Sequence, residues 1–158
     1  MPQYESYNWN IDTDALVNAY LSNKGLTMPA AGSTGGSLVI DAAISTTSGN
    51  LSLTAAQNVT ASAPGTLATG GGSVTVQAGD AAQLSGITTA GGSVAITAGS
   101  TATFISPLTI SGPFLLTAGG NSTFNQAISG SGALTVNTSG ITRFNGAISG
   151  LGSLLTNT

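Results

Sequence analysis

The sequence contains no cysteine and no histidine, and only 4 % of its 158 residues are charged, against roughly 25 % in ordinary soluble domains. Cysteine and histidine supply many of the nucleophiles, proton-transfer groups and transition-metal ligands of proteins. Their absence removes the usual catalytic side chains, and we expect neither a catalytic residue nor a metal site nor a cofactor. Without cysteine the chain also has no disulfide framework, so cysteine usage does not indicate a compartment.

Charge of either sign is too sparse to attract a charged partner. The chain has two basic and five acidic residues, for a net charge of −3 at pH 7. Lys24 and Arg143 lie far apart in the sequence and cannot together form a phosphate-binding face. We therefore expect no nucleic-acid partner.

Long apolar runs are also missing. No stretch reaches the about 18 apolar residues that suggest a membrane-spanning helix, so we expect no membrane insertion. The first residues, Met1-Pro2-Gln3-Tyr4-Glu5, show neither the basic nor the apolar region of a signal peptide. If the protein is exported, we expect the chain to be a mature or excised piece.

What the sequence does contain is a repeat of twenty residues that begins at Ser73. Four consecutive blocks read SVTVQAGDAAQLSGITTAGG, SVAITAGSTATFISPLTISG, PFLLTAGGNSTFNQAISGSG and ALTVNTSGITRFNGAISGLG. Glycine closes each block, at Gly92, Gly112, Gly132 and Gly152. We expect these glycines to form corners of the chain, where positive φ angles favour glycine.

Large apolar residues recur at three fixed places in the blocks. The second place holds Val74, Val94, Phe114 and Leu134. The fourth place holds Val76, Ile96, Leu116 and Val136. The twelfth place holds Leu84, Phe104, Phe124 and Phe144. Apolar residues two apart are typical of strands with one buried face, so we predict that these twelve residues form inward-facing core ladders.

A twenty-residue unit is too small to bury its own apolar face, but stacked units bury it against each other. The sequence therefore predicts an all-β fold, a right-handed parallel β-helix or β-solenoid, with about six rungs and a length of about 30 Å. The hand follows from the preference of parallel strand crossovers. The competing fold is an antiparallel β-sandwich, which also has short strands but needs no constant period.

Before residue 73 the repeat is looser. The apolar strand at Leu51 precedes Val74 by 23 residues, and the extra residues fit a longer corner near residues 63–66. The strand at residues 37–40 lies so close to Leu51 that we expect the first turn to be incomplete or shaped differently.

The ends of the solenoid are expected to differ. We predict that residues 1–33 form an N-terminal capping segment with one short helix, because residues 9–25 combine a helix N-cap, an apolar stripe and a Lys-Gly stop. Residues 34–158 then form the solenoid. At the other end residues 153–156 begin a strand with no cap, so we expect a longer solenoid or completion by another subunit.

Several segments resemble the filamentous-haemagglutinin-type exoproteins of bacterial two-partner secretion and related giant repeat-containing surface proteins. Residues 9–13, 37–44 and 49–55 resemble the opening of a repeat block in that family, and residues 130–140 with 144–147 resemble another of its repeats. The resemblance implies a right-handed β-helical shaft displayed at the cell surface or released. The Asn-Pro-Asn and Arg-Gly-Asp motifs are not found, so the segment resembles shaft and not secretion domain or receptor-binding tip.

Candidate binding and catalytic features each have a simpler structural interpretation. Asp41 and Asp80 occupy different columns and do not form the carboxylate pair of a glycosidase. Asp80 follows Gly79 as in calcium-binding β-rolls, but a single carboxylate is not the repeated loop that such sites require. The phenylalanine ladder occupies the place of Leu84, which favours the core over a carbohydrate platform. Gln77, Thr97, Thr117 and Asn137 form a polar row that we expect to face solvent. Regular Thr-x-Thr rows would suggest ice binding, but the adjacent row is broken by Ala95 and Leu115.

The sequence thus predicts a non-catalytic structural rod of an extracellular bacterial surface protein, adhesin-like in purpose. The expected partners are the solenoid's own ends and a host or neighbouring-cell surface. The alternative is a self-assembling extracellular filament subunit that stacks end to end through open solenoid edges.

Overall fold

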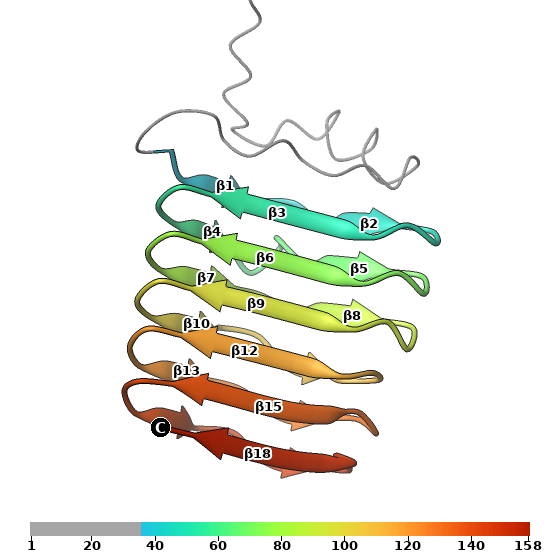
Figure 1. The fold of residues 1–158 in the computed structure, drawn as a ribbon. Coiled ribbons are helices and arrows are strands. Elements are labelled where there is room, and N and C mark those ends of the chain that lie inside the picture. Colours follow the sequence, from blue (N-terminus) through green and yellow to red (C-terminus); the bar gives the residue numbers. More distant parts are fainter. Residues whose placement is uncertain (1–35) are drawn as a thin grey trace, which may run out of the picture.

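The computed structural model describes residues 36–158, which wind into three parallel β-sheets around one core (Figure 1). Each sheet contains six strands, and consecutive strands of the chain belong to the three sheets in turn. Three strands therefore make one rung, and six rungs make a β-solenoid. No helix occurs within 36–158, and the predicted helical cap at residues 1–33 lies outside the described residues.

The strands are short, and each is followed in its sheet by the corresponding strand of the next rung. Sheet A contains β1 (Leu38–Ile40), β4 (Val59–Ala61), β7 (Ala82–Leu84), β10 (Ala102–Phe104), β13 (Ser122–Phe124) and β16 (Thr142–Phe144). Sheet B contains β2 (Ile44–Thr46), β5 (Leu67–Thr69), β8 (Ile87–Thr89), β11 (Leu108–Thr109), β14 (Ile128–Ser129) and β17 (Ile148–Ser149). Sheet C contains β3 (Leu51–Ala55), β6 (Val74–Ala78), β9 (Val94–Ala98), β12 (Phe114–Ala118), β15 (Ala133–Thr138) and β18 (Ser153–Asn157).

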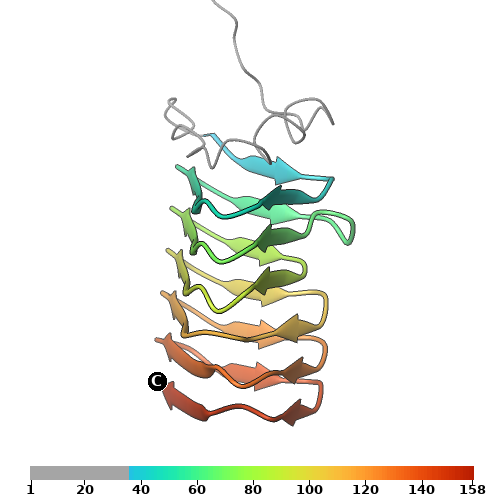
Figure 2. The same ribbon diagram turned by 90° about the vertical axis from the view of Figure 1, so that its right-hand side faces the viewer.

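The coil is right-handed. In Figure 1 the strands of sheet C run leftward at the front, the chain returns behind them through sheets A and B, and each turn lies below the one before. Viewed from the first rung, the chain turns clockwise as it recedes. Figure 2 shows the same stack from the side, with the rungs roughly parallel to each other. The predicted fold class is thus confirmed, and the sandwich alternative is wrong because all strand pairs in the sheets are parallel.

From the third rung onward sheets A and C keep a register of twenty residues. Ala82 pairs with Ala102 in sheet A, and Val94 pairs with Phe114 in sheet C. In sheet B one step differs, because Thr88 pairs with Thr109, 21 positions on. Two residues separate β7 from β8, whereas three separate β10 from β11. Because β11 is one residue shorter than β8, sheet C keeps its period.

The first rung contains one strand of each sheet, so the prediction that the first turn would be incomplete or shaped differently is wrong. The strand at residues 38–40 does not belong to the same sheet as the strand at Leu51; it pairs with Val59 in sheet A. Leu51 pairs with Val74 in sheet C, 23 residues later. The first turn therefore starts in sheet A and not in sheet C, and the spacing between its three strands is like that of the later rungs. The longer corner expected near residues 63–66 lies between β4 and β5.

Alternate side chains of the strands point inward and form one apolar core. Among the bulkiest fully buried side chains are Ile40, Leu53, Ile96, Leu116 and Phe124, which come from the first to the fifth rung. Outward positions of the same strands carry mainly serine, threonine, asparagine and glutamine. No helix of the described residues is long and apolar enough to cross a bilayer.

Candidate functional site

The predicted core ladders lie where sheets C and A face the interior. Val74, Val94, Phe114 and Leu134 pair in one column of sheet C, and all four are buried. Val76, Ile96, Leu116 and Val136 form the next inward column of the same sheet and are buried as well. These columns run through the shaft without a polar interruption as far as the fifth rung.

The phenylalanine ladder fills the interior beside sheet A. The rings of Phe104 and Phe124 are stacked with centroids 4.6 Å apart and planes 4° apart, and Phe144 stacks on Phe124 at 5.0 Å. Phe114 from sheet C meets Phe104 edge to face at 5.8 Å. Phe104 and Phe124, like Leu84 above them, are buried, whereas Phe144 in the sixth rung is partly buried. Rings enclosed in this way stabilise the core and offer no face to a sugar.

The corner glycines have a different physical reason from the one expected. Positive φ angles occur at Gly71, Gly91, Gly130 and Gly150, and not at the glycines that close the blocks. At each of those closing glycines an added Cβ would strike a backbone carbonyl oxygen of the rung before: 2.0 Å away at Gly92, 2.5 Å at Gly112, 2.2 Å at Gly132 and 2.7 Å at Gly152. Glycine is required there because two backbones approach closely, and the prediction of positive φ at these four positions is wrong.

A second corner feature was missed by the sequence analysis. Thr46, Thr69 and Thr89 form a buried column at the end of sheet B. Each threonine Oγ1 donates a hydrogen bond to the carbonyl oxygen three residues later, with lengths of 2.6, 2.5 and 2.8 Å. The signal in the sequence was a threonine three residues before a glycine in each of the first three rungs. In the fourth rung Ile110 is buried at the corresponding corner.

Asparagine side chains connect successive rungs. The Oδ1 of Asn50 accepts from the backbone N–H of Ser73 at 2.8 Å, and the Oδ1 of Asn121 accepts from that of Ile141 at 2.8 Å. Asparagines also pair with each other across rungs: Asn125 with Asn145 at 3.0 Å, and Asn137 with Asn157 at 2.7 Å. These contacts give the asparagines a structural role in holding the stacking register.

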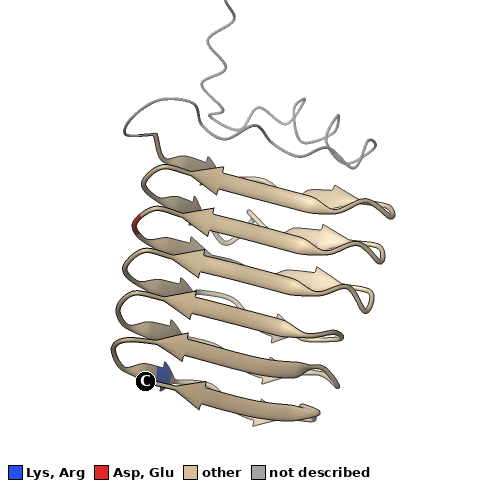
Figure 3. Ribbon diagram, in the orientation of Figure 1, with Lys and Arg blue, Asp and Glu red and all other residues tan. Residues whose placement is uncertain are grey.

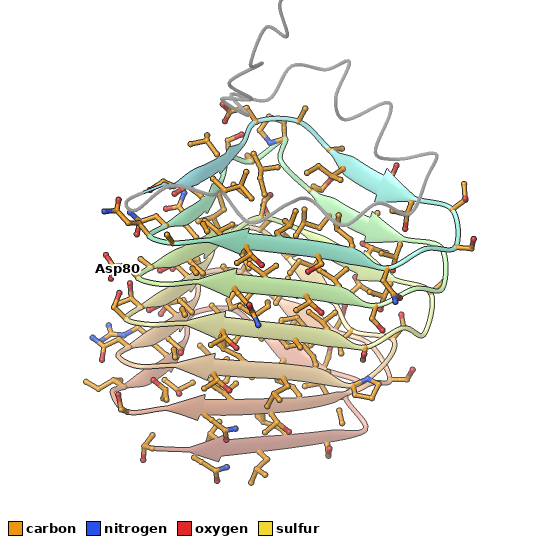
Figure 4. The ribbon with its side chains drawn as sticks, turned by 45° about the horizontal axis from the view of Figure 1, so that its top comes forward. Asp80 is labelled. Carbon is orange, nitrogen blue, oxygen red and sulfur yellow. The ribbon has the colours of Figure 1, made fainter. Side chains whose placement is uncertain are left out.

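Three charged residues occur within 36–158, and they belong to different corners and strands. Figure 3 shows one acidic corner and one basic strand, well apart in the stack. Asp41 follows β1 at the corner before β2, whereas Asp80 lies at the corner between β6 and β7. Figure 4 shows the Asp80 side chain projecting away from the shaft. Arg143 is exposed in the middle of β16. In this part of the chain no three side chains of His, Cys, Asp or Glu gather into a group that would hold a metal ion.

The outer face of sheet C is the broadest flat surface of the shaft, because its strands are the longest. One outward column reads Gln77, Thr97, Thr117 and Asn137, and the neighbouring one contains Ala95 and Leu115. Thr117, Asn137 and Asn157 lie beside a shallow hollow at the end of these strands. The surface offers hydroxyl and amide groups and hardly any charge.

The sixth rung is the most exposed part of the described core. β16, β17 and β18 each lie at the margin of their sheet, with hydrogen-bonding partners on one side. Phe144, Ile148 and Leu151 are partly buried, and Leu154 is 45 % exposed.

No protein-family model matches the chain, and neither the curated proteins nor the solved structures contain a match to it. The chain's own geometry is that of a parallel β-solenoid compatible with a β-helical shaft.

Proposed function

We propose that the chain is a non-catalytic structural shaft of an extracellular bacterial surface protein, adhesin-like and resembling filamentous-haemagglutinin-type exoproteins. The observation that carries the proposal is the unbroken stack of six rungs on one apolar core, with mainly small polar side chains on the outside of the strands. Such a stack extends by about 4.8 Å per rung and is held by backbone hydrogen bonds along its whole length. This construction suits a spacer that holds another part of a protein away from a cell.

The surface chemistry supports a role outside the cell. Arg143 is the single lysine or arginine within 36–158, so trypsin-like proteases have one cleavage position in the shaft. Local opening of the backbone must break hydrogen bonds between neighbouring rungs. A protease needs such an opened segment, so the stacking opposes proteolysis. Low charge also makes the surface insensitive to the salt concentration around the cell.

Localisation and attachment are tested separately. Antibodies raised against the folded chain are expected to label intact cells that produce it, without permeabilisation. Beads coated with the chain are then compared with beads coated with Ile96→Asp, whose core is disrupted, for retention on host or neighbouring cells. Labelling restricted to permeabilised cells contradicts the surface proposal. Equal retention of the two bead types contradicts direct adhesion by the shaft and leaves the spacer role.

The alternative is an end-to-end filament, in which copies of the chain stack through the outermost strands of their three sheets. Electron microscopy of the purified chain over a range of concentrations separates the two functions. Uniform fibres favour the filament, and discrete particles favour the shaft.

A further inference from the structure

The rungs of the shaft are not joined equally along sheet B. In this sheet β8 and β11, of the third and fourth rungs, pair only through Thr88 and Thr109. Every other pair of neighbouring strands in the sheet is joined at two or three positions. The junction between the third and fourth rungs is therefore the weakest of sheet B.

Backbone hydrogen bonds at the start of the sheet B strands show the same interruption. In the first, second, fourth and fifth rungs the first N–H of the strand donates to the carbonyl oxygen that precedes the corresponding strand of the next rung: Ile44 to Thr66 at 2.8 Å, Leu67 to Gly86 at 2.9 Å, Leu108 to Ala127 at 3.0 Å and Ile128 to Ala147 at 2.9 Å. In the third rung the equivalent residues are Ile87 and Pro107, and within residues 36–158 no such bond joins them. The N–H of Ile87 thus adds nothing to the junction.

The cause lies in the corners on either side of β8 and β11. The corner from sheet A contains two residues before β8, whereas it contains three before β11. At the other end Thr89 forms a hydrogen bond within its corner, whereas its counterpart in the fourth rung is the apolar Ile110. Because both corners change between the third and fourth rungs, the backbones of β8 and β11 are in register only at the middle of β8.

Sheets A and C continue across the same junction without a break. In sheet A β7 and β10 pair from Ala82 with Ala102 to Leu84 with Phe104. In sheet C β9 and β12 pair over the whole length of both strands. The junction is thus firm on two sides of the shaft and weak on the third, and local opening begins where the fewest hydrogen bonds must break.

We propose that the shaft contains a bending point between its third and fourth rungs, where sheet B opens while sheets A and C stay paired and act as the hinge. Opening exposes the buried side chains of Ile87 and Leu108, and this cost keeps the straight shaft the major state. A shaft that bends at one place lets the parts on either side of it change direction without unfolding. This conformational role goes beyond that of a rigid spacer and does not depend on where the protein is displayed.

A disulfide across the junction tests the proposal in the full chain, which has no cysteine of its own. Thr88→Cys with Thr109→Cys joins β8 to β11 on the exposed side of sheet B, where parallel neighbours are about 4.8 Å apart and within the range of a disulfide. Ala68→Cys with Thr88→Cys is the matched control, because it joins β5 to β8 in the same outward column. The two disulfides span 21 and 20 positions, so they restrict the unfolded chain almost equally.

Amide hydrogen exchange of the native state measures the opening. In the unmodified chain the amides of Thr89 and Thr109 are expected to exchange about tenfold faster or more than those of Thr69 and Ser129, their counterparts in the neighbouring rungs. The disulfide between β8 and β11 is expected to remove this difference, whereas the control disulfide leaves it. Equal exchange in the unmodified chain, or equal slowing by the two disulfides, overturns the proposal.

Spin labels measure the bend itself. One pair is attached at Ser45→Cys and Ser129→Cys on the outside of sheet B, and the control pair at Ser52→Cys and Thr135→Cys on the outside of sheet C, each from the first rung to the fifth. In urea below the unfolding midpoint the sheet B pair is expected to gain a second, longer distance. The sheet C pair is expected to keep a single distance, because sheet C belongs to the hinge. Distances that change together in the two pairs, or that change in neither, overturn the bending point.

Discussion

Val74 pairs with Val94 in the parallel ladder between β6 and β9, although the two residues are twenty positions apart in the chain. Both side chains are buried, and the same column continues to Phe114 and Leu134. A column of this kind makes the stability of one rung depend on its neighbours, because each inward side chain is covered by those above and below it. The consequences of single substitutions follow from the column that a residue occupies.

Phe124 is in the middle of the phenylalanine stack and is expected to be the most sensitive of its column. Phe124→Ala removes a buried ring that contacts Phe104 on one side and Phe144 on the other, and is expected to cost about 3 to 5 kcal/mol of unfolding free energy. Thermal and denaturant unfolding measure this loss. Thr123→Ala is the control, because Thr123 is on the same strand and its side chain is turned outward. An unchanged melting temperature for Phe124→Ala would show that the ring does not support the core.

Ile96 is expected to tolerate no charge. Ile96→Asp places an ionised carboxylate among Val76, Leu116 and other apolar side chains with no counter-charge, and we expect the chain not to fold. Far-ultraviolet circular dichroism is expected to lose its β-sheet spectrum. Thr97→Asp adds the same charge at the next residue, which is exposed, and is expected to fold. If both variants fold equally well, the inward assignment of this column is contradicted.

The regular part of this fold was predictable because each column repeats one kind of side chain at one interval. The first rung was not, since apolar triplets such as residues 38–40 and 51–53 look alike whether they belong to sheet A or to sheet C. Only the pairing of Leu38 with Val59 distinguishes them.

The candidate surfaces were predictable to a smaller degree. The outward row of Gln77, Thr97 and Thr117 was expected to face solvent, and all three are exposed. The threonine hydrogen bonds at the sheet B corners and the asparagine contacts between rungs were not predicted. Both depend on the exact path of the backbone at a corner, which the alternation of apolar and polar residues does not specify.

Glycine at the end of a block is expected to be required for space and not for conformation. Gly92→Ala places a methyl group 2.0 Å from the carbonyl oxygen of Gly72, so either the corner or the rung above must shift. We expect a loss of about 1 to 3 kcal/mol, the usual cost of overpacking. Gly86→Ala is the matched control, because its added methyl group would meet nothing closer than the Cγ2 of Thr66, at 3.4 Å. Equal unfolding midpoints for the two variants in urea would contradict the close-approach argument.

Thr69 is expected to contribute through its hydroxyl group more than through its methyl group. Its Oγ1 donates to the carbonyl oxygen of Gly72 at 2.5 Å in a buried corner, so Thr69→Val keeps the shape of the side chain and leaves that carbonyl without its donor. A buried polar group without its partner costs about 1 to 3 kcal/mol, and we expect a loss in this range on urea unfolding. Thr88→Val is the control. Thr88 belongs to the third rung, pairs with Ala68 of the second, and lies on the exposed side of sheet B. A Thr69→Val variant as stable as Thr88→Val would mean that the corner is held by backbone contacts alone and that the threonine column is dispensable.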